Sequence, residues 1–329
     1  MNNPRRLTAL FLVLLAFQSL CFAKAPAINW YGFDKTFISN HYSDSAIGDI
    51  TAKRFHPAQN VHGIDCGGDD GELHIGLRLP EVSLTSAEMP LTAPIVDGDV
   101  NWGLVAELPN AALANGPSLL ASLEGKSATF HGYFRVWEEG HGAGASPPSN
   151  PHHVFEVHPA WGFDGGNIHF MRKNLVASVS GFSGYGATKF KPMFQAFTDG
   201  TWPLAFQDGR QLHVGLMKNA NFYQLPVKVK TIHDFAGGKE ITLDAFSDQA
   251  MSHLVYHGLT GITVSGSPIN NSISVGQKTF LLGFFSVNLK KALSKSTGST
   301  SEGNAVNVKD AVEFFIFGAA TKGAVSSCS

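Results

Sequence analysis

The sequence predicts an all-β protein, and three observations favour this class. Runs of β-branched and aromatic residues with apolar/polar alternation recur along most of the chain, as is typical of strands. The chain contains 35 glycines and 25 phenylalanines, a composition that favours many turns between strands with an aromatic core. Helix-like periodicity is confined to short segments.

Five strands are expected in the first half, with a helical segment at residues 110–124 between the third and the fourth. Their expected bounds are Ile50–Phe55, Glu72–Leu79, Gly103–Leu108, Ser127–Trp137 and Val154–His158. The helical segment can form one short helix or two turns interrupted at Gly116-Pro117. This layout is that of an N-terminal OB-like five-stranded barrel. In such a barrel the third strand lies between the second and the fifth.

A second small β domain is expected after a linker. Its strands are predicted at Val227–Ile232, Glu240–Phe246, Leu259–Val264, Thr279–Phe285 and Ala311–Phe317, with a helix at Leu289–Ser294. The sequence leaves open whether this domain closes into a barrel. The expected organisation is a signal peptide (1–23), a leading arm (24–49), the OB-like barrel (50–163), a linker with peripheral strands (164–224) and the second β domain (225–329).

The N-terminus has the pattern of a secretory signal peptide. Arg5 and Arg6 precede a short apolar run, and cleavage is expected after Ala23, with Ala25 as the alternative. The run is shorter than the roughly 20 residues of a spanning helix, and no later segment is long and apolar enough to span a bilayer. We therefore expect an exported protein, periplasmic or extracellular. A lipoprotein anchor at Cys21 is disfavoured by the large Leu20 before it.

Charge and cysteine content limit the partners. The formal net charge is −2, without the clustered basic residues that nucleic-acid binding requires. The partner is expected to be a small molecule or a glycan. Cys66 and Cys328 would remain in the mature chain, and the sequence leaves open whether they form a disulfide.

The same short motif, Glu-x-His, occurs in two of the expected strands. Because alternate residues of a strand share a face, Glu72 and His74 share one face, and so do Glu156 and His158. If the third strand lies between these two, Glu107 stands between the pairs. Carboxylates and imidazoles are usual ligands of zinc and manganese, so a divalent metal is one cofactor expected here. Ion pairs on a solvated sheet face are the alternative.

Further polar residues are expected near this cluster. They form a candidate rim of Asp70, His141 and His153. On the fourth strand, alternation places Tyr133, Arg135 and Trp137 on one face, which is either part of a core or a stacking platform.

These segments resemble a group of largely uncharacterised bacterial OB-like domains. The matching pieces are Asp70-Gly71-Glu72-Leu73-His74-Ile75, Ala106-Glu107-Leu108-Pro109 and Glu156-Val157-His158-Pro159, within residues 50–163. Glu72 stands where those domains have aspartate. The resemblance implies the fold and a shared polar cluster, and it implies no reaction.

The favoured hypothesis is an exported binding protein whose ligand, in one version a divalent metal, contacts the acid/histidine cluster. One alternative is a metal-dependent hydrolase of a phosphoester or glycan, with metal-bound water as nucleophile. Another is a structural protein in which the cluster only ties strands together.

Overall fold

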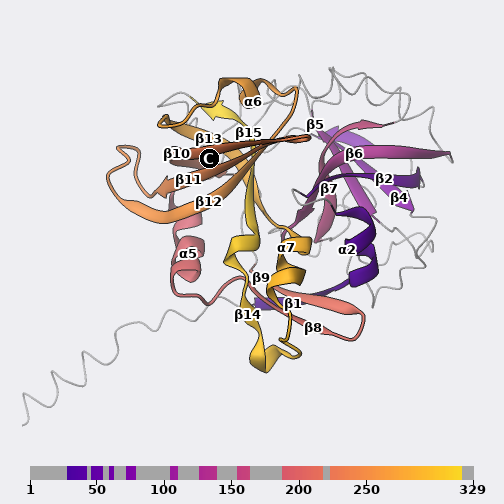
Figure 1. Ribbon diagram of the computed structural model, residues 1–329. Helices are drawn as coiled ribbons and strands as arrows, with labels where there is room; N and C mark the ends of the chain where they lie inside the picture. Colours follow the sequence, from indigo (N-terminus) through magenta and orange to yellow (C-terminus); the bar gives the residue numbers. More distant parts are fainter. Residues whose placement is uncertain are drawn as a thin grey trace, which may run out of the picture.

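The computed structural model describes residues 28–42, 46–54, 59–62, 72–78, 104–109, 126–138, 154–163, 187–217 and 223–320. Strands dominate this part of the chain, so the prediction of an all-β protein is confirmed (Figure 1). The predicted signal peptide, the rim candidates Asp70, His141 and His153, and the cysteines Cys66 and Cys328 lie outside the described residues.

The first β domain is a six-stranded sheet in the order β2-β6-β7-β5-β4-β3. Its strands are β2 (Ile47–Arg54), β3 (Gln59–His62), β4 (Glu72–Arg78), β5 (Leu104–Pro109), β6 (Ser127–Val136) and β7 (Phe155–Phe163). β5 pairs antiparallel with β4 and parallel with β7, which confirms that the third predicted strand lies between the second and the fifth.

The position of the closed barrel corrects the prediction. Five strands of the first sheet meet in a ring, but β2 and β4 pair only through Lys53 and Arg54 opposite Arg78 and Leu77. β2 and β3 pair with the same edge of β4. Because β3 occupies the first residues of that edge, only the last residues of β4 pair with β2. The fully closed barrel is in the second domain.

The second domain is a closed five-stranded barrel in the order β10-β11-β12-β15-β13. Its strands are β10 (Tyr223–Phe235), β11 (Gly238–Phe246), β12 (Leu254–Val264), β13 (Lys278–Val287) and β15 (Val312–Ala320). Short elements join them, namely α6 (Pro268–Ser272), α7 (Leu289–Lys295), η2 (Glu302–Asn304), β14 (Val306–Asn307) and η3 (Lys309–Ala311). Each predicted strand of this half and the predicted helix are present.

The two rings share their strand order and directions. In each, the first strand pairs antiparallel with the second and the fourth, and the third pairs parallel with the fifth. Gly132 on β6 and Gly283 on β13 lie three residues before Arg135 and Ser286, which pair with Glu156 and Glu313 of the respective fifth strands. At both glycines an added Cβ would overlap the neighbouring fifth strand. The rings therefore share their topology and the placement of this glycine, although only the second ring is fully closed.

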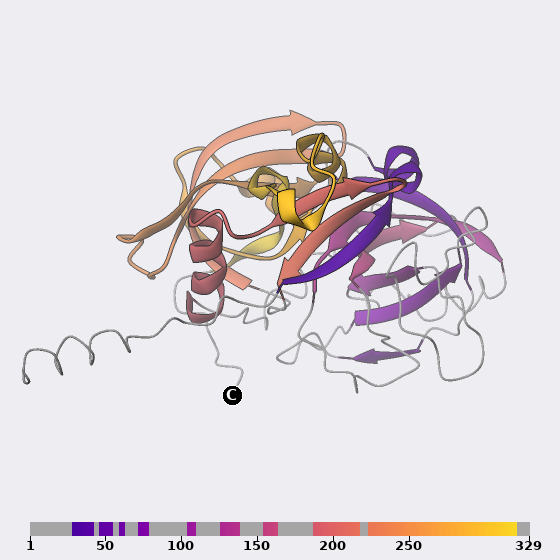
Figure 2. The same ribbon diagram turned by 90° about the horizontal axis from the view of Figure 1, so that it is seen from below.

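A third, four-stranded sheet lies across one end of both rings (Figure 2). Its order is β1-β9-β8-β14, with β1 (Ile28–Asp34), β8 (Leu204–Asp208) and β9 (Gln211–Met217). Part of the predicted leading arm thus forms β1 and the following helix α2 (Lys35–His41). The predicted linker contributes the peripheral strands β8 and β9, and also the unpredicted helix α5 (Ala187–Thr198).

Asp34 caps α2 and joins it to the third sheet. Its carboxylate accepts hydrogen bonds from the amides of Thr36 and Phe37 and pairs with Arg210 at 2.8 Å. Burial raises the pKa of Asp34, but the bonds from Phe37, Arg210 and Thr36 outweigh it and bring the pKa below its ordinary value. The charged form therefore stabilises the fold.

We expect Asp34→Ala to lower the free energy of unfolding by about 1–2 kcal/mol at pH 7. Because the pKa of Asp34 is lowered in the folded state, this stabilisation is present above the unfolded pKa of about 4 and is lost as pH falls through the folded value. Urea denaturation at pH 7 and at acid pH measures both effects. Asp199→Ala, at an exposed carboxylate bonded to Gln195, is the control. Equal losses in both variants would contradict the capping role.

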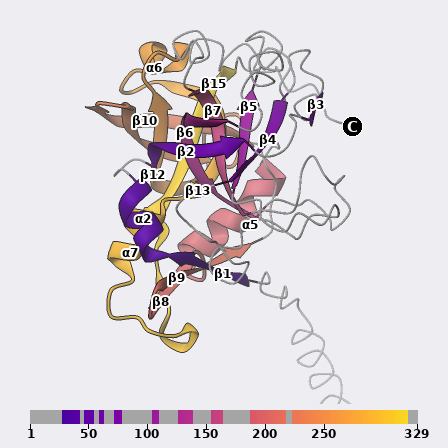
Figure 3. The same cartoon turned by 90° about the vertical axis from the view of Figure 1, so that its right-hand side faces the viewer.

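The core continues from one ring into the other. Inside the first ring Phe134 and Phe155 pack against each other and against Tyr42. The opposite face of β6, predicted to carry Tyr133, Arg135 and Trp137, packs against β13 and β15. The centroids of the Tyr133 and Phe315 side-chain rings are 4.8 Å apart. β7 and residues 132–136 of β6 are thus buried on both faces. Figure 3 shows the first ring in front of the second.

Candidate functional site

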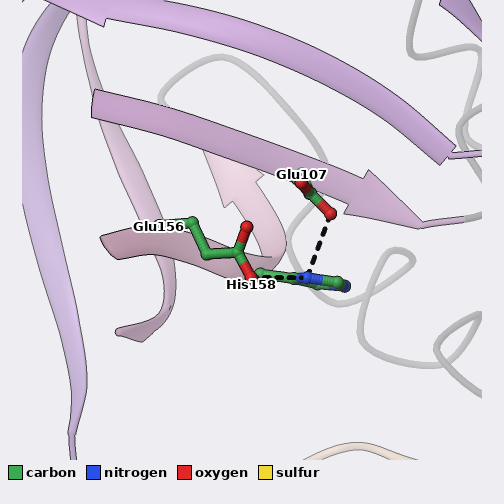
Figure 4. Close-up of side chains that lie close together, drawn as sticks. All are labelled: Glu107, Glu156 and His158. Carbon is green, nitrogen blue, oxygen red and sulfur yellow. Dashed lines mark hydrogen bonds and ion pairs between the residues drawn. The ribbon is translucent and has the colours of Figure 1, made fainter. Parts of the chain in front are cut away.

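A buried polar cluster lies where β5, β6 and β7 meet, and it is here called the first-ring cluster: Glu107, Arg135, Glu156 and His158. His158 Nδ1 lies 3.0 Å from Glu107 Oε2 and 3.0 Å from Glu156 Oε1. Arg135 Nη1 lies 2.7 Å from the same Glu156 oxygen. Figure 4 shows both carboxylates directed at one edge of the imidazole ring.

The strand register explains this convergence. β5 and β7 are parallel, with Val105 opposite Glu156 and Ala106 opposite Val157. One further step along both strands brings Glu107 alongside His158, and alternation keeps Glu156 and His158 on one face. On β6, the other neighbour of β7, Arg135 lies opposite Glu156.

The cluster is closed off from solvent by the second ring. The side chains of His158, Glu107 and Glu156 are 0%, 3% and 4% exposed. The Phe284 ring of β13 lies 4.8 Å from the His158 ring and 4.4 Å from the Arg135 guanidinium carbon. Arg135 Nε also donates to the Phe285 carbonyl oxygen at 3.4 Å. The site is therefore a junction between the two rings.

The charges of the cluster allow two chemical states. Two carboxylates and one guanidinium leave a net charge of −1, which a protonated imidazole neutralises. A divalent cation can replace that proton, since one ligand atom from each of Glu107, Glu156 and His158 lies within 4.8 Å of the others. Two carboxylates and an imidazole suit zinc or manganese as ligands. The arrangement can thus hold either a shared proton or a metal ion.

The structure brings together three of the five predicted site residues. Glu107, Glu156 and His158 are in contact, as described. For the other Glu-x-His motif the backbone of β4 is described, and its register pairs His74 with Glu107 and Glu72 with Pro109. The strands that carry the two motifs therefore flank β5, as the predicted strand order required.

Arg135 was not among the predicted site residues. Its position on the Tyr133–Trp137 face was predicted, but alternation does not show which neighbouring strand a face meets. The signal that could have identified it is a lone arginine within an otherwise aromatic face, since a buried arginine needs an acidic partner.

A second buried carboxylate, Glu313, occupies the equivalent place in the second ring. It is 0% exposed and accepts hydrogen bonds from Tyr133 Oη at 2.8 Å and Asn288 Nδ2 at 2.9 Å. Lys291 Nζ lies 3.0 Å from it. Burial lowers the pKa of Lys291, but Glu313 and Glu240 raise it above its ordinary value.

The two clusters differ in one residue that bears on metal binding. In the second ring Phe315 stands two residues after Glu313, where the first ring has His158 after Glu156. Glu313 is held by a hydroxyl, an amide and an ammonium group, and none of these is a usual ligand for zinc. The second ring therefore provides a natural comparison for the first.

Comparisons with protein-family models, curated proteins and solved structures find no match to the chain. Among the described residues, every helix is too short or too polar to cross a bilayer.

Proposed function

We propose that this is an exported binding protein that holds a divalent cation at Glu107, Glu156 and His158. The observation that carries the proposal is the convergence of these three ligand groups on adjacent parallel strands. His74 is proposed as a fourth ligand, because its backbone position lies opposite Glu107. The export part of the proposal is supported by the signal-peptide pattern of residues 1–23.

We also propose that both rings are OB-like barrels. The shared strand order, with parallel third and fifth strands, supports this assignment, as does the short-motif resemblance in residues 50–163. The assignment concerns fold, and the cation proposal does not depend on it.

A structural role is the second candidate, and the contact between Arg135 and Glu156 favours it. The guanidinium already occupies Glu156 Oε1 at 2.7 Å, and a protonated His158 would complete a neutral ion network that joins β5, β6 and β7. The hydrolase alternative has less support, because a substrate would have to reach side chains that are at most 4% exposed.

The test is metal binding by the purified mature chain and by two matched variants. After treatment with EDTA, we expect zinc or manganese to raise the melting temperature, since a ligand at 100 times its Kd stabilises by about 2.7 kcal/mol. Glu156→Gln should weaken binding at least about tenfold, because it removes a ligand charge. Glu313→Gln, at the equivalent buried place without a histidine, should bind as the parent does.

Two results would contradict the cation proposal. One is a chain that carries no metal when purified and shows no thermal shift with zinc, manganese or calcium. The other is equal loss of binding in Glu156→Gln and Glu313→Gln, which would reflect a general change of the inter-ring core. A stable, metal-indifferent protein destabilised by Glu156→Gln would support the structural role.

A further inference from the structure

Three phenylalanines of the second ring cover the proposed cation site, and they are here called the aromatic roof: Phe284 of β13 and Phe315 and Phe317 of β15. The centroids of their phenyl groups lie 5.2, 5.3 and 5.4 Å from one another. The phenyl groups of Phe284 and Phe317 lie 4.8 Å and 6.3 Å from the His158 imidazole. Each roof residue is at most 5% exposed, so the imidazole is covered by packed aromatic surface.

The roof is a fixed part of the junction between the rings. Phe284 shares its face of β13 with Ser286, whose hydroxyl accepts a hydrogen bond from the Val136 amide of β6 at 3.0 Å. The other two roof residues share their face of β15 with Glu313, which accepts a hydrogen bond from Tyr133 of β6. The contacts that dock the second ring on β6 therefore also hold the roof over the site.

The described residues offer a small number of ligand atoms to a cation. Glu107, Glu156 and His158 each offer one, and His74 is proposed as a fourth ligand. One oxygen of Glu156 already accepts a hydrogen bond from Arg135 at 2.7 Å. A cation that needs both Glu156 oxygens would have to displace the guanidinium. The site is therefore suited to an ion that is satisfied by four ligands.

The spacing of the ligand atoms suits zinc. His158 Nδ1 lies 3.0 Å from one oxygen of Glu107 and 3.0 Å from one oxygen of Glu156. In a tetrahedral zinc site with bonds of about 2.0 Å, neighbouring ligand atoms are about 3.3 Å apart. Small shifts of the three side chains would therefore admit the ion.

Other divalent cations need more ligands than zinc does. Calcium takes about six to eight oxygen ligands, and magnesium and manganese favour octahedral sites that water commonly completes. The three ligand side chains are at most 4% exposed, so water would have to enter beneath the aromatic roof to complete such a shell. The roof therefore penalises six-coordinate ions more than it penalises zinc.

We propose that the site selects zinc over manganese and calcium, and that the aromatic roof determines this selectivity because it withholds the water ligands that six-coordinate ions need. This inference rests on the proposed cation site. Phe284 is its main specificity-determining residue, supplied by the second ring to a site whose ligands belong to the first.

The test is titration of the full mature chain with zinc, manganese and calcium in competition with a chromogenic chelator. Zinc should bind at least about a hundredfold more tightly than either other ion. Phe284→Ala should lower the ratio of zinc affinity to manganese affinity roughly tenfold, because water can then complete the manganese shell. Phe280→Ala, on the same strand but in a separate cluster with Phe246 and Met251, should leave the ratio unchanged.

Phe317→Ala opens the roof at a second place, and the same fall in the ratio is expected. Because the ratio compares two ions on one variant, a general loss of stability leaves it unchanged. Manganese or calcium binding within tenfold of zinc would overturn the selectivity and leave the cation proposal standing. A parental ratio in both roof variants would also overturn it. Failure of all three ions to bind would overturn the cation proposal and this inference together.

Discussion

Arg135→Ala is expected to lower the free energy of unfolding by about 3–5 kcal/mol in urea denaturation. Arg135 is fully buried, and it is the guanidinium partner of Glu156 at 2.7 Å. Without it, the carboxylates of Glu156 and Glu107 would lie together in a buried site that has lost the guanidinium charge. The variant also loses the contact between the guanidinium and the phenyl group of Phe284 in the second ring of strands. Part of the lost stability therefore comes from the junction between the two rings.

Arg210→Ala provides the matched control. Arg210 also pairs with a carboxylate at 2.8 Å, that of Asp34, but its side chain is 74% exposed. Asp34 is buried, but its carboxylate keeps the hydrogen bonds from the amides of Thr36 and Phe37 when the solvated Arg210 head is removed, so the control should lose at most about 1 kcal/mol. If the two arginine variants lost similar amounts of stability, the first-ring cluster would not be an electrostatically closed site.

Strand positions and the neighbours of Glu107 could be predicted because they depend on local sequence and on one topological rule. Alternation predicted strands at Glu72–Leu79 and Val154–His158, and the OB-like order then placed the strand of Glu107 between them. The histidine and the two glutamates were therefore identifiable without knowledge of the second domain.

The burial of the cluster could not be predicted in the same way. Alternation shows which residues share a face, but not whether that face meets solvent or another domain. On β7 both faces are buried, because Phe155 and Val157 fill the first ring while Glu156 and His158 face the second. A polar face that resembled a solvated surface is therefore part of a domain junction.

Helix α5 illustrates a different limit. Its chain follows the glycine-rich segment 181–186 and contains Pro192, features that favour loops. Its buried residues Met193, Phe194 and Phe197 follow helical spacing over little more than one turn, which is too short for periodicity to identify. Packing against the second ring stabilises the helix, and that contact is invisible in the local sequence.

Phe284→Ala is expected to lower the free energy of unfolding by about 3–5 kcal/mol, the usual cost of truncating a buried phenylalanine. Phe284 is fully buried and touches both halves of the junction. The centroid of its phenyl group lies 5.4 Å from that of Phe315 in the second ring of strands and 4.8 Å from that of His158 in the first. Its loss would leave a cavity directly over the charged cluster.

Combining Phe284→Ala with Arg135→Ala tests whether the phenyl ring stabilises the guanidinium itself. Since the two groups are 4.4 Å apart, the double variant should lose less than the sum of the single losses, with a coupling of about 0.5–3 kcal/mol. Phe280→Ala is the control on the same strand, because Phe280 belongs to a separate small cluster with Phe246 and Met251. Its loss should add to that of Arg135→Ala within about 0.5 kcal/mol. Additive losses for both phenylalanines would mean that the ion network is stable without the second ring, and that the rings merely lie against each other.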